Sequence, residues 1–222
     1  SLQPPEANGQ WRLAGELNGG RLAHRGREVA ASATERLRVA AAFERFAGID
    51  LLASITRGGD CDRARLAADA RRAGVSPAED DSWSDIFSRI MASLIEPKLG
   101  RDCVSVLDAY PAPEAALARL DPKDPRTAQR FEIFACGLEL ANGFAELTDA
   151  AEQRIRLTLA MEEKERRYGT RYPLDEDFLA ALAHMPPAAG VALGFDRLAM
   201  LATDAPRIDD VMWTPPWRPV AR

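Results

Sequence analysis

Two carboxylates and an amide stand close together within residues 137–153, whose sequence is GLELANGFAELTDAAEQ. Glu139 and Glu146 flank Asn142, and the residues between them are otherwise apolar or small. Carboxylates at the edge of an apolar core must either find a cation or change their pKa. The spacing therefore favours a site for a cationic ligand, a metal ion, or both. A strand end with two exposed glutamates explains the same pattern equally well.

A second stretch, GVALGFDRLAML at 190–201, places small residues at alternate positions before a helix-like segment. Gly190, Ala192 and Gly194 would share one face of a strand, because strand side chains alternate between faces. That face is almost bare, so a planar group could lie against the backbone. The residues between them are expected to point into the core. Arg197 follows at the predicted helix start, where its guanidinium could reach a polyphosphate. Tight packing of a strand on a helix is the alternative interpretation.

Composition limits the classes of function. The chain has 222 residues, 46% of them hydrophobic, which allows a sizeable core in one domain or two small ones. A net charge of −5 argues against non-specific electrostatic binding of nucleic acid. No apolar run approaches the roughly 20 residues of a membrane-spanning helix, and no signal peptide is visible. We therefore expect a soluble, cytoplasmic protein without a membrane partner.

The cysteines and histidines do not indicate a metal centre. Cys61, Cys103 and Cys136 lie far apart without a CxxC motif, and His24 and His184 are isolated. A zinc site is therefore not expected. We interpret the cysteines as reduced, small core residues of a cytoplasmic protein.

The pattern predicts more helices than strands. Helical spacing of apolar residues indicates a helix that ends at Gly48, and further helices at 60–73, 82–95, 149–168 and 174–184. Ile155, Leu159 and Met161 are expected on the buried side of the helix at 149–168. Strands are expected at 103–107, 130–134 and 190–194, and NGG at 18–20 could close a hairpin. The predicted fold class is α+β, with an antiparallel sheet and helices packed on one side.

Together, the two stretches resemble the class II lysyl-tRNA synthetase catalytic domain, and GVALGFDRLAML looks like its motif 3. The resemblance is closest to the short lysyl-tRNA synthetase paralogues that ligate β-lysine to elongation factor P. It covers roughly residues 25–215 and includes the segments ERFAGIDLL, YPAPEAALARL, RFEIFACGLELANGF and RIDDVMWTP. It implies a class II aminoacyl-tRNA synthetase-like antiparallel sheet flanked by helices.

The resemblance also implies roles for seven residues. ATP would be bound by Glu139, Leu140, Gly194 and Arg197, of which Glu139 would also hold Mg²⁺, and Glu139 and Arg197 would serve catalysis. The lysine-like amino acid would be bound by Asn142, Glu146 and Ala192. Lysyl-tRNA synthetases usually carry glycine at the position of Ala192, whereas the paralogues carry alanine, so this residue favours β-lysine.

The implied reaction has two steps. ATP and lysine or β-lysine would give an enzyme-bound aminoacyl-adenylate, and the acyl group would then pass to a lysine of elongation factor P. Charging of tRNA, as in lysyl-tRNA synthetases, is the first alternative. A truncated, non-catalytic paralogue that binds a nucleotide or a partner is the second. The family also implies a homodimer.

Motif 1, which builds the dimer interface of the family, and motif 2, whose arginine grips the α-phosphate, are not found. Residues 1–24 are interpreted as a diverged or linker-like leader, and residues 25–222 as the C-terminal part of the catalytic domain. The fold is therefore expected to be incomplete at the N-terminus. The resemblance favours an enzyme, a ligase that forms an aminoacyl-adenylate, but it leaves the activity of this particular chain open.

Overall fold

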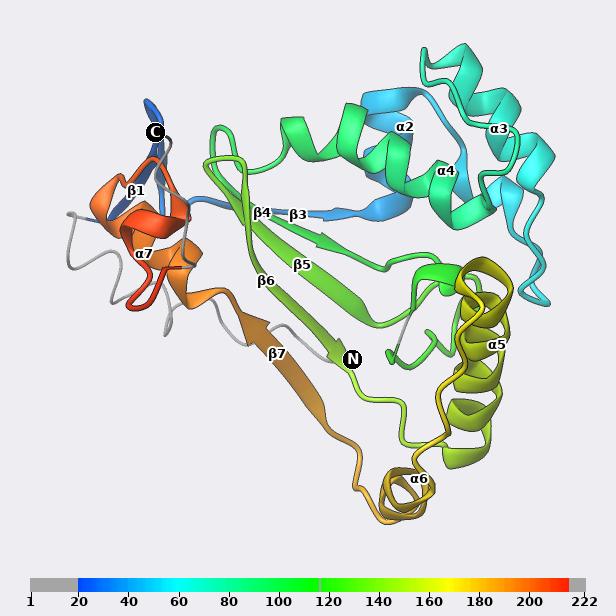
Figure 1. The fold of residues 1–222 in the computed structure, drawn as a ribbon. Coiled ribbons are helices and arrows are strands. Elements are labelled where there is room, and N and C mark those ends of the chain that lie inside the picture. The colour runs from blue at the N-terminus through cyan, green and yellow to red at the C-terminus, as the bar shows by residue number, and fades with distance from the viewer. Residues whose placement is uncertain (1–19, 116, 216–222) are drawn as a thin grey trace, which may run out of the picture.

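The computed structural model describes residues 20–115 and 117–215 (Figure 1). Its strands form a hairpin and a separate five-stranded sheet in the order β3-β4-β5-β6-β7. The hairpin consists of β1 (Arg21–His24) and β2 (Arg27–Ala30), and the sheet of β3 (Thr34–Arg38), β4 (Val104–Asp108), β5 (Arg130–Ala135), β6 (Leu138–Ala145) and β7 (Ala189–Leu193).

Six α-helices accompany the strands in the described part of the chain. They are α2 (Val39–Ala47), α3 (Arg63–Arg72), α4 (Trp83–Ile90), α5 (Ala150–Tyr168), α6 (Glu176–Leu182) and α7 (Phe195–Thr203). Local chemistry sets their ends. Gly48 closes α2 in the left-handed conformation that glycine adopts without strain. The Asp149 side chain caps α5 by accepting hydrogen bonds from two backbone amides of its first turn. The predicted helices are confirmed, with ends shifted by a few residues.

The sheet is mixed. The pairs β4–β5, β5–β6 and β6–β7 are antiparallel, as predicted, but β3 pairs with β4 in parallel. The expectation of a wholly antiparallel sheet is therefore wrong at this edge. Residues 34–38, TERLR, contain one apolar side chain, Leu37, so their sequence carries no strand pattern. The long helical connection from β3 to β4 returns the chain to the same end of the sheet, as a parallel pair requires.

Helices pack on both faces of the sheet, not on one as expected. Leu37, Leu107 and Phe134 share one face and form a core with α2 and α4. Val104 and Ala135 belong to a second cluster, in which the β1–β2 hairpin and α7 pack together. Val104 and Ser105 are successive strand residues, and Ser105 pairs with Phe134, so Val104 points to the opposite face.

Strand β1 lies upstream of residue 25 and packs with α7. Leu22 on β1 is fully buried and packs against α7 through Leu201. The boundary that we expect after residue 24 therefore falls in the hairpin turn, at Arg25 and Gly26, which both have positive φ. Residues 1–19, with most of the predicted turn at 18–20, lie outside the described residues.

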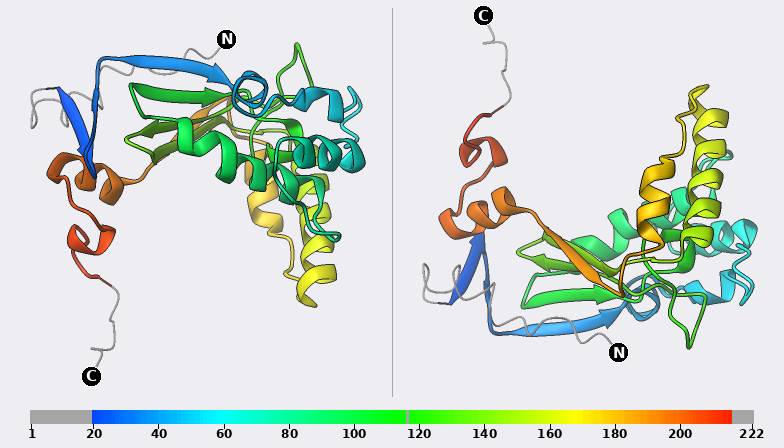
Figure 2. Two further views of the ribbon diagram at one scale, coloured as in Figure 1. Left: turned by 90° about the horizontal axis from the view of Figure 1, so that it is seen from above. Right: turned by 90° about the horizontal axis from the view of Figure 1, so that it is seen from below.

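Helices α5 and α6 project from the end of the sheet that lies opposite α7 (Figures 1 and 2). Ile155 and Leu159 are 61% and 59% exposed, and Gln153 is the buried residue of α5. The prediction that Ile155 and Leu159 face the core is wrong, because α5 runs away from the sheet instead of across it. Met161 is half-buried.

The cysteines differ in their surroundings. Cys136 is buried, as predicted for a core residue, but Cys103 is only partly buried and Cys61 is exposed. Among the described helices, none combines the length and the apolar composition that a membrane crossing requires.

Leu107 links the central sheet to the helical core, and truncating it tests this packing. We expect Leu107→Ala to lower the free energy of unfolding by about 2–5 kcal/mol, because the side chain is fully buried and leaves a cavity. Leu159→Ala, at an exposed position, should change it by no more than about 0.5 kcal/mol. Urea denaturation of both variants measures the difference. An equal loss of unfolding free energy in the two variants would contradict this placement of the core.

Candidate active site

The β5–β6 hairpin contains an irregularity on which the site depends. Its two-residue turn consists of Cys136 and Gly137, with φ of 52° and 81°. Pairing shifts by one residue between Ile133 and Phe134, so Leu140 on β6 has no partner on β5. This is a β-bulge, a feature that often re-aims side chains near active sites.

The bulge decides which side chains share a face. In a regular strand, Glu139 and Asn142 would point to opposite faces, because they are three residues apart. Here Glu139 pairs with Phe134 and Asn142 pairs with Glu132, and these two β5 residues point the same way. Glu139 and Asn142 therefore lie on one face, which also carries Ala192, the partner of Asn142 on β7. We call it the site face.

The start of α7 closes one end of the site. The Gly194 amide donates to the Leu140 carbonyl at 2.8 Å, and Arg197 Nη1 donates to the Glu139 carbonyl at 2.8 Å and to its Oε2 at 3.3 Å. The Leu140 side chain is buried in the second core cluster. Of the four residues predicted to bind ATP, Leu140 could therefore contact a ligand only through its backbone.

A cavity of about 350 Å³ adjoins this end of the site. Glu139 and Arg197 line it together with Arg27 and Glu96, two residues that the sequence analysis did not single out. Burial, and then the nearby charge of Glu139, raise the pKa of Glu96. The cavity thus combines two guanidinium groups and two carboxyl groups, and it suits a ligand that carries phosphate. We call it the nucleotide end of the site.

Asn142, Glu146 and Ala192 form the other end, which we call the amine end. The Glu146 carboxylate lies over Gly190, where an added Cβ would meet Oε1 at 2.9 Å. A side chain at position 190 would therefore displace the Glu146 carboxylate, which is the mobile end of a flexible side chain. Within the described residues, the Glu146 carboxylate makes no hydrogen bond or ion pair, so it could accept an ammonium.

The prediction of a strand face bare of side chains at Gly190, Ala192 and Gly194 is confirmed only in part. At Gly194 an added Cβ would make ordinary contacts of 3.5 Å or more, so no described neighbour requires glycine there. Its place beneath an adenosine stays a prediction. Val191 is 42% exposed, so the expectation that it points into the core is wrong. Strand β7 is an edge of the described sheet, and no strand among the described residues pairs with its far side.

Two further residues of the amine end come from β5. Arg130 Nη2 donates to Glu132 Oε1 at 2.6 Å, and Arg130 Nε donates to Asn142 Oδ1 at 3.3 Å. Burial raises the pKa of Glu132, and the charge of Arg130 opposes this effect. Alternation in RFEIF could have placed Arg130 and Glu132 on one face, but the bulge that sets Glu132 opposite Asn142 has no sequence signal.

Glu139 and Glu146 lie at different ends of the site. Glu146 lies seven positions after Glu139, just beyond the end of β6, which at ~3.3 Å per residue is about 23 Å of extended chain. One small ligand group cannot touch both carboxylates, whereas an extended ligand could lie between them. The structure thus places the seven predicted residues along β6 and β7, just beyond the end of β6, and at the start of α7, as two groups, with Leu140 contributing only its backbone.

The described residues contain no group of three or more histidine, cysteine, aspartate or glutamate side chains that could hold a metal ion. This does not conflict with Mg²⁺ at Glu139. Mg²⁺ often binds one or two carboxylates and completes its shell with water and substrate phosphates. The half-exposed Glu139 carboxylate, next to a cavity with two arginines, fits that arrangement.

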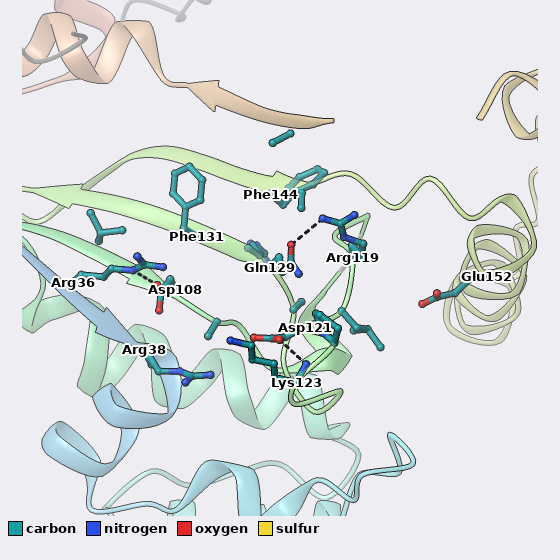
Figure 3. A pocket seen from close by; sticks show the side chains of 18 residues that line it. Arg36, Arg38, Asp108, Arg119, Asp121, Lys123, Gln129, Phe131, Phe144 and Glu152 are labelled. Atoms are coloured by element: carbon teal, nitrogen blue, oxygen red, sulfur yellow. Dashed lines mark hydrogen bonds and ion pairs between the residues drawn. The ribbon is translucent and has the colours of Figure 1, made fainter. Parts of the chain in front are cut away.

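A larger cavity of about 1060 Å³ lies on the opposite face of the sheet (Figure 3). Phe131 and the ion pair between Arg36 and Asp108 line it. Phe131 and Glu132 are successive strand residues, so they point to opposite faces. None of the seven predicted residues lines this cavity, and we assign the site to the other face.

The family model for tRNA synthetases class II (D, K and N) matches residues 24–218. The chain belongs to this family. Three curated relatives bear the name elongation factor P (R)-β-lysine ligase. That of Haemophilus influenzae (strain PittGG) is 38% identical over 171 residues, that of Mannheimia succiniciproducens 40% over 171, and that of Pectobacterium carotovorum 41% over 154.

These alignments cover 77%, 77% and 68% of this chain but 51%, 51% and 47% of the relatives. The chain thus spans about half the length of the curated relatives it matches. The resemblance to the class II family and the α+β architecture are confirmed. What the relatives act on is carried to this chain below, as a proposal.

The raised pKa of Glu96 gives a test with a definite sign. A carboxyl group whose pKa is higher in the folded state destabilises the fold when it ionises, so this penalty develops as the pH rises above the ordinary value of 4.5. We expect Glu96→Gln to remove the penalty. The variant should be more stable than the wild type at pH 8 and should lose that advantage at pH 4.

Urea denaturation at both pH values measures the effect. Glu44→Gln, at an exposed position on α2, controls for the loss of one negative charge. If Glu96→Gln exceeds the wild type in free energy of unfolding by the same amount at pH 4 and at pH 8, the pKa of Glu96 is not raised.

Proposed function

We propose that this protein takes part in ATP-dependent activation of a lysine-like amino acid, β-lysine or lysine, and in its transfer to a lysine of elongation factor P. The observation that carries the proposal is the charge layout of the site face. The Glu146 carboxylate, which has no hydrogen bond or ion pair among the described residues, stands at one end, and the guanidinium of Arg197 stands at the other. The names of the curated relatives support the choice of amino acid and acceptor.

At the nucleotide end, Arg197 would bind the phosphates of ATP, and Glu139 would face the metal ion. The Leu140 backbone and Gly194 would lie against the adenosine. Arg197 donates to Glu139 in the structure, and both side chains are more than a third exposed. Such a pair is worth roughly 0–1 kcal/mol, so a phosphate could displace it at little cost.

At the amine end, Glu146 and Asn142 would hold an amino group of the substrate, and Ala192 would set the space beside it. Ala192 pairs with Asn142 across β6 and β7, so its methyl group lies next to the amide on the site face. This supports a role for Ala192 in the choice between β-lysine and lysine. The half-buried Glu146 suits an ammonium because it has no other described partner.

The chemistry balances without a covalent protein intermediate. A carboxylate oxygen of the amino acid attacks the α-phosphorus of ATP, and the bond to the β-phosphate breaks to release pyrophosphate. The acceptor amine then attacks the acyl carbon, and AMP and a proton leave. The protein residues would contribute positioning and charge stabilisation, chiefly through Arg197. Mg²⁺, when bound at Glu139, would neutralise phosphate charge.

Three further expectations belong to this proposal. A cytoplasmic location fits the free cysteines and the activities in the relatives' names. A homodimer follows from the resemblance alone. Elongation factor P is preferred to tRNA as acceptor because the relatives' names specify it and because the net charge of −5 gives no general affinity for nucleic acid.

Pyrophosphate exchange tests the activation step. We expect the purified protein, with ATP and Mg²⁺, to exchange pyrophosphate more efficiently with (R)-β-lysine than with lysine. Arg197→Ala should lower the rate by roughly 100- to 1000-fold, because a charge-stabilising donor is lost. Glu146→Gln should mainly raise the KM for the amino acid. Arg65→Ala, on an exposed face of α3, is the control for loss of one arginine.

The acceptor and the alternatives are settled by companion measurements. A mass increase of elongation factor P by one lysyl group supports the proposal, and charging of tRNA with no such increase would replace it with the synthetase activity. Calorimetric binding of ATP with Mg²⁺ but no exchange would identify a non-catalytic nucleotide-binding protein. Neither binding nor exchange would overturn the proposal.

A further inference from the structure

Arg130 lies beside Asn142 at the amine end, also borders the larger cavity, and contacts four neighbours. Its Nη1 donates to the Glu114 carbonyl at 2.7 Å, while Nη2 and Nε reach Glu132 and Asn142. The guanidinium also lies over the Tyr110 ring, 4.4 Å from the ring centre. Its side chain is only 17% exposed. The planar fork of an arginine suits this set of acceptors, because it presents several donors in fixed directions.

These contacts fix the orientation of the Asn142 amide. Its oxygen accepts from Arg130, and its nitrogen lies 3.5 Å from Glu132 Oε1. A flipped amide would place the NH₂ group against the guanidinium and the oxygen against the carboxylate. Both contacts would then be repulsive, so Arg130 and Glu132 together select one orientation.

Arg130 also sets the charge of the amine end. It pairs with the buried Glu132, and these two charges cancel. Of Glu132 and Glu146, only Glu146 therefore remains without a described partner for its carboxylate. Without Arg130, Glu132 would be a second, buried and uncompensated charge, which is costly in a protein interior.

We propose that Arg130 is a positioning residue for the amino group of the substrate. It holds Asn142 in the orientation that presents its amide to the ligand, and it cancels Glu132 so that Glu146 alone attracts the ammonium. This inference rests on the proposed function for the identity of the ligand. The orientation of the Asn142 amide does not depend on the proposed function.

The first test compares Arg130→Lys with the wild type. Lysine keeps the positive charge and most of the stem, but its three donors sit on a single nitrogen, so it lacks the planar fork with which Arg130 reaches three acceptors from three nitrogens. We expect Arg130→Lys to raise the Kd for (R)-β-lysine or lysine by roughly 10- to 100-fold, the usual effect of losing a hydrogen bond made by a charged group. The Kd for ATP with Mg²⁺ should stay within about 2-fold of the wild type. Arg119→Lys, which alters an arginine bonded to Gln129, is the matched control.

A coupling measurement separates positioning from general stability. If Arg130 acts through Asn142, adding Arg130→Lys to Asn142→Ala should weaken amino-acid binding little beyond Asn142→Ala alone. Additive losses would overturn the proposal. An equal weakening of ATP and amino-acid binding in Arg130→Lys would also overturn it, because that pattern indicates a general change of the fold.

Nuclear magnetic resonance keeps the proposal testable if a variant fails to fold or if no amino acid binds. In the wild type, the Arg130 Nε proton should exchange slowly with water. In Arg130→Lys, the Asn142 side-chain NH₂ signals should shift, and in Arg119→Lys they should not. Unchanged Asn142 signals in Arg130→Lys, or a rapidly exchanging Arg130 Nε proton in the wild type, would refute the positioning role. Failure of the wild type to bind either amino acid would instead refute the proposed function.

Discussion

The site depends on the one-residue shift in pairing between β5 and β6. Because strand side chains alternate, this shift turns Glu139 and Asn142 to the same face and sets Glu132 opposite Asn142. The bulged residue is held from two directions. The Leu140 side chain is buried in the second core cluster, and its carbonyl accepts from the Gly194 amide at the start of α7. The second core, formed by α7 and the β1–β2 hairpin, therefore stabilises the bulge as well as the end of the sheet.

The sequence identifies the parts of the site that lie within one segment. Glu139, Asn142 and Glu146 stand in one short segment, and Arg197 stands in the first turn of a helix, so residue types and spacing point to them. Arg130 and Glu132 could not be found in this way. A two-residue turn at 136–137 with regular pairing would set residue 132 opposite 141, and only the observed shift sets it opposite 142. The energies that fix the shift come from packing and from α7, which are distant in the sequence.

The fold shows the same division between local and long-range information. Helix ends that depend on one residue, such as Gly48 after α2 and Asp149 before α5, were predictable from side-chain chemistry. The parallel pairing of β3 with β4 was not, because TERLR has no strand pattern and its partner lies about seventy residues further along the chain. The exposure of Leu159 was missed for a related reason. Periodicity identifies the apolar side of a helix, but it cannot show whether another element covers that side.

The two ends of the site differ in how firmly their charges are held. Arg197 and Glu139 are 45% and 37% exposed, so water screens their attraction and an arriving anion can replace the carboxylate. Arg130 and Glu132 are 17% and 11% exposed, and separating them would leave a buried charge without a partner. The nucleotide end can therefore rearrange around a ligand, while Arg130, Glu132 and Asn142 of the amine end are fixed beforehand. A preorganised amine end suits recognition of a small cation, because little ordering is left to occur when the ligand binds.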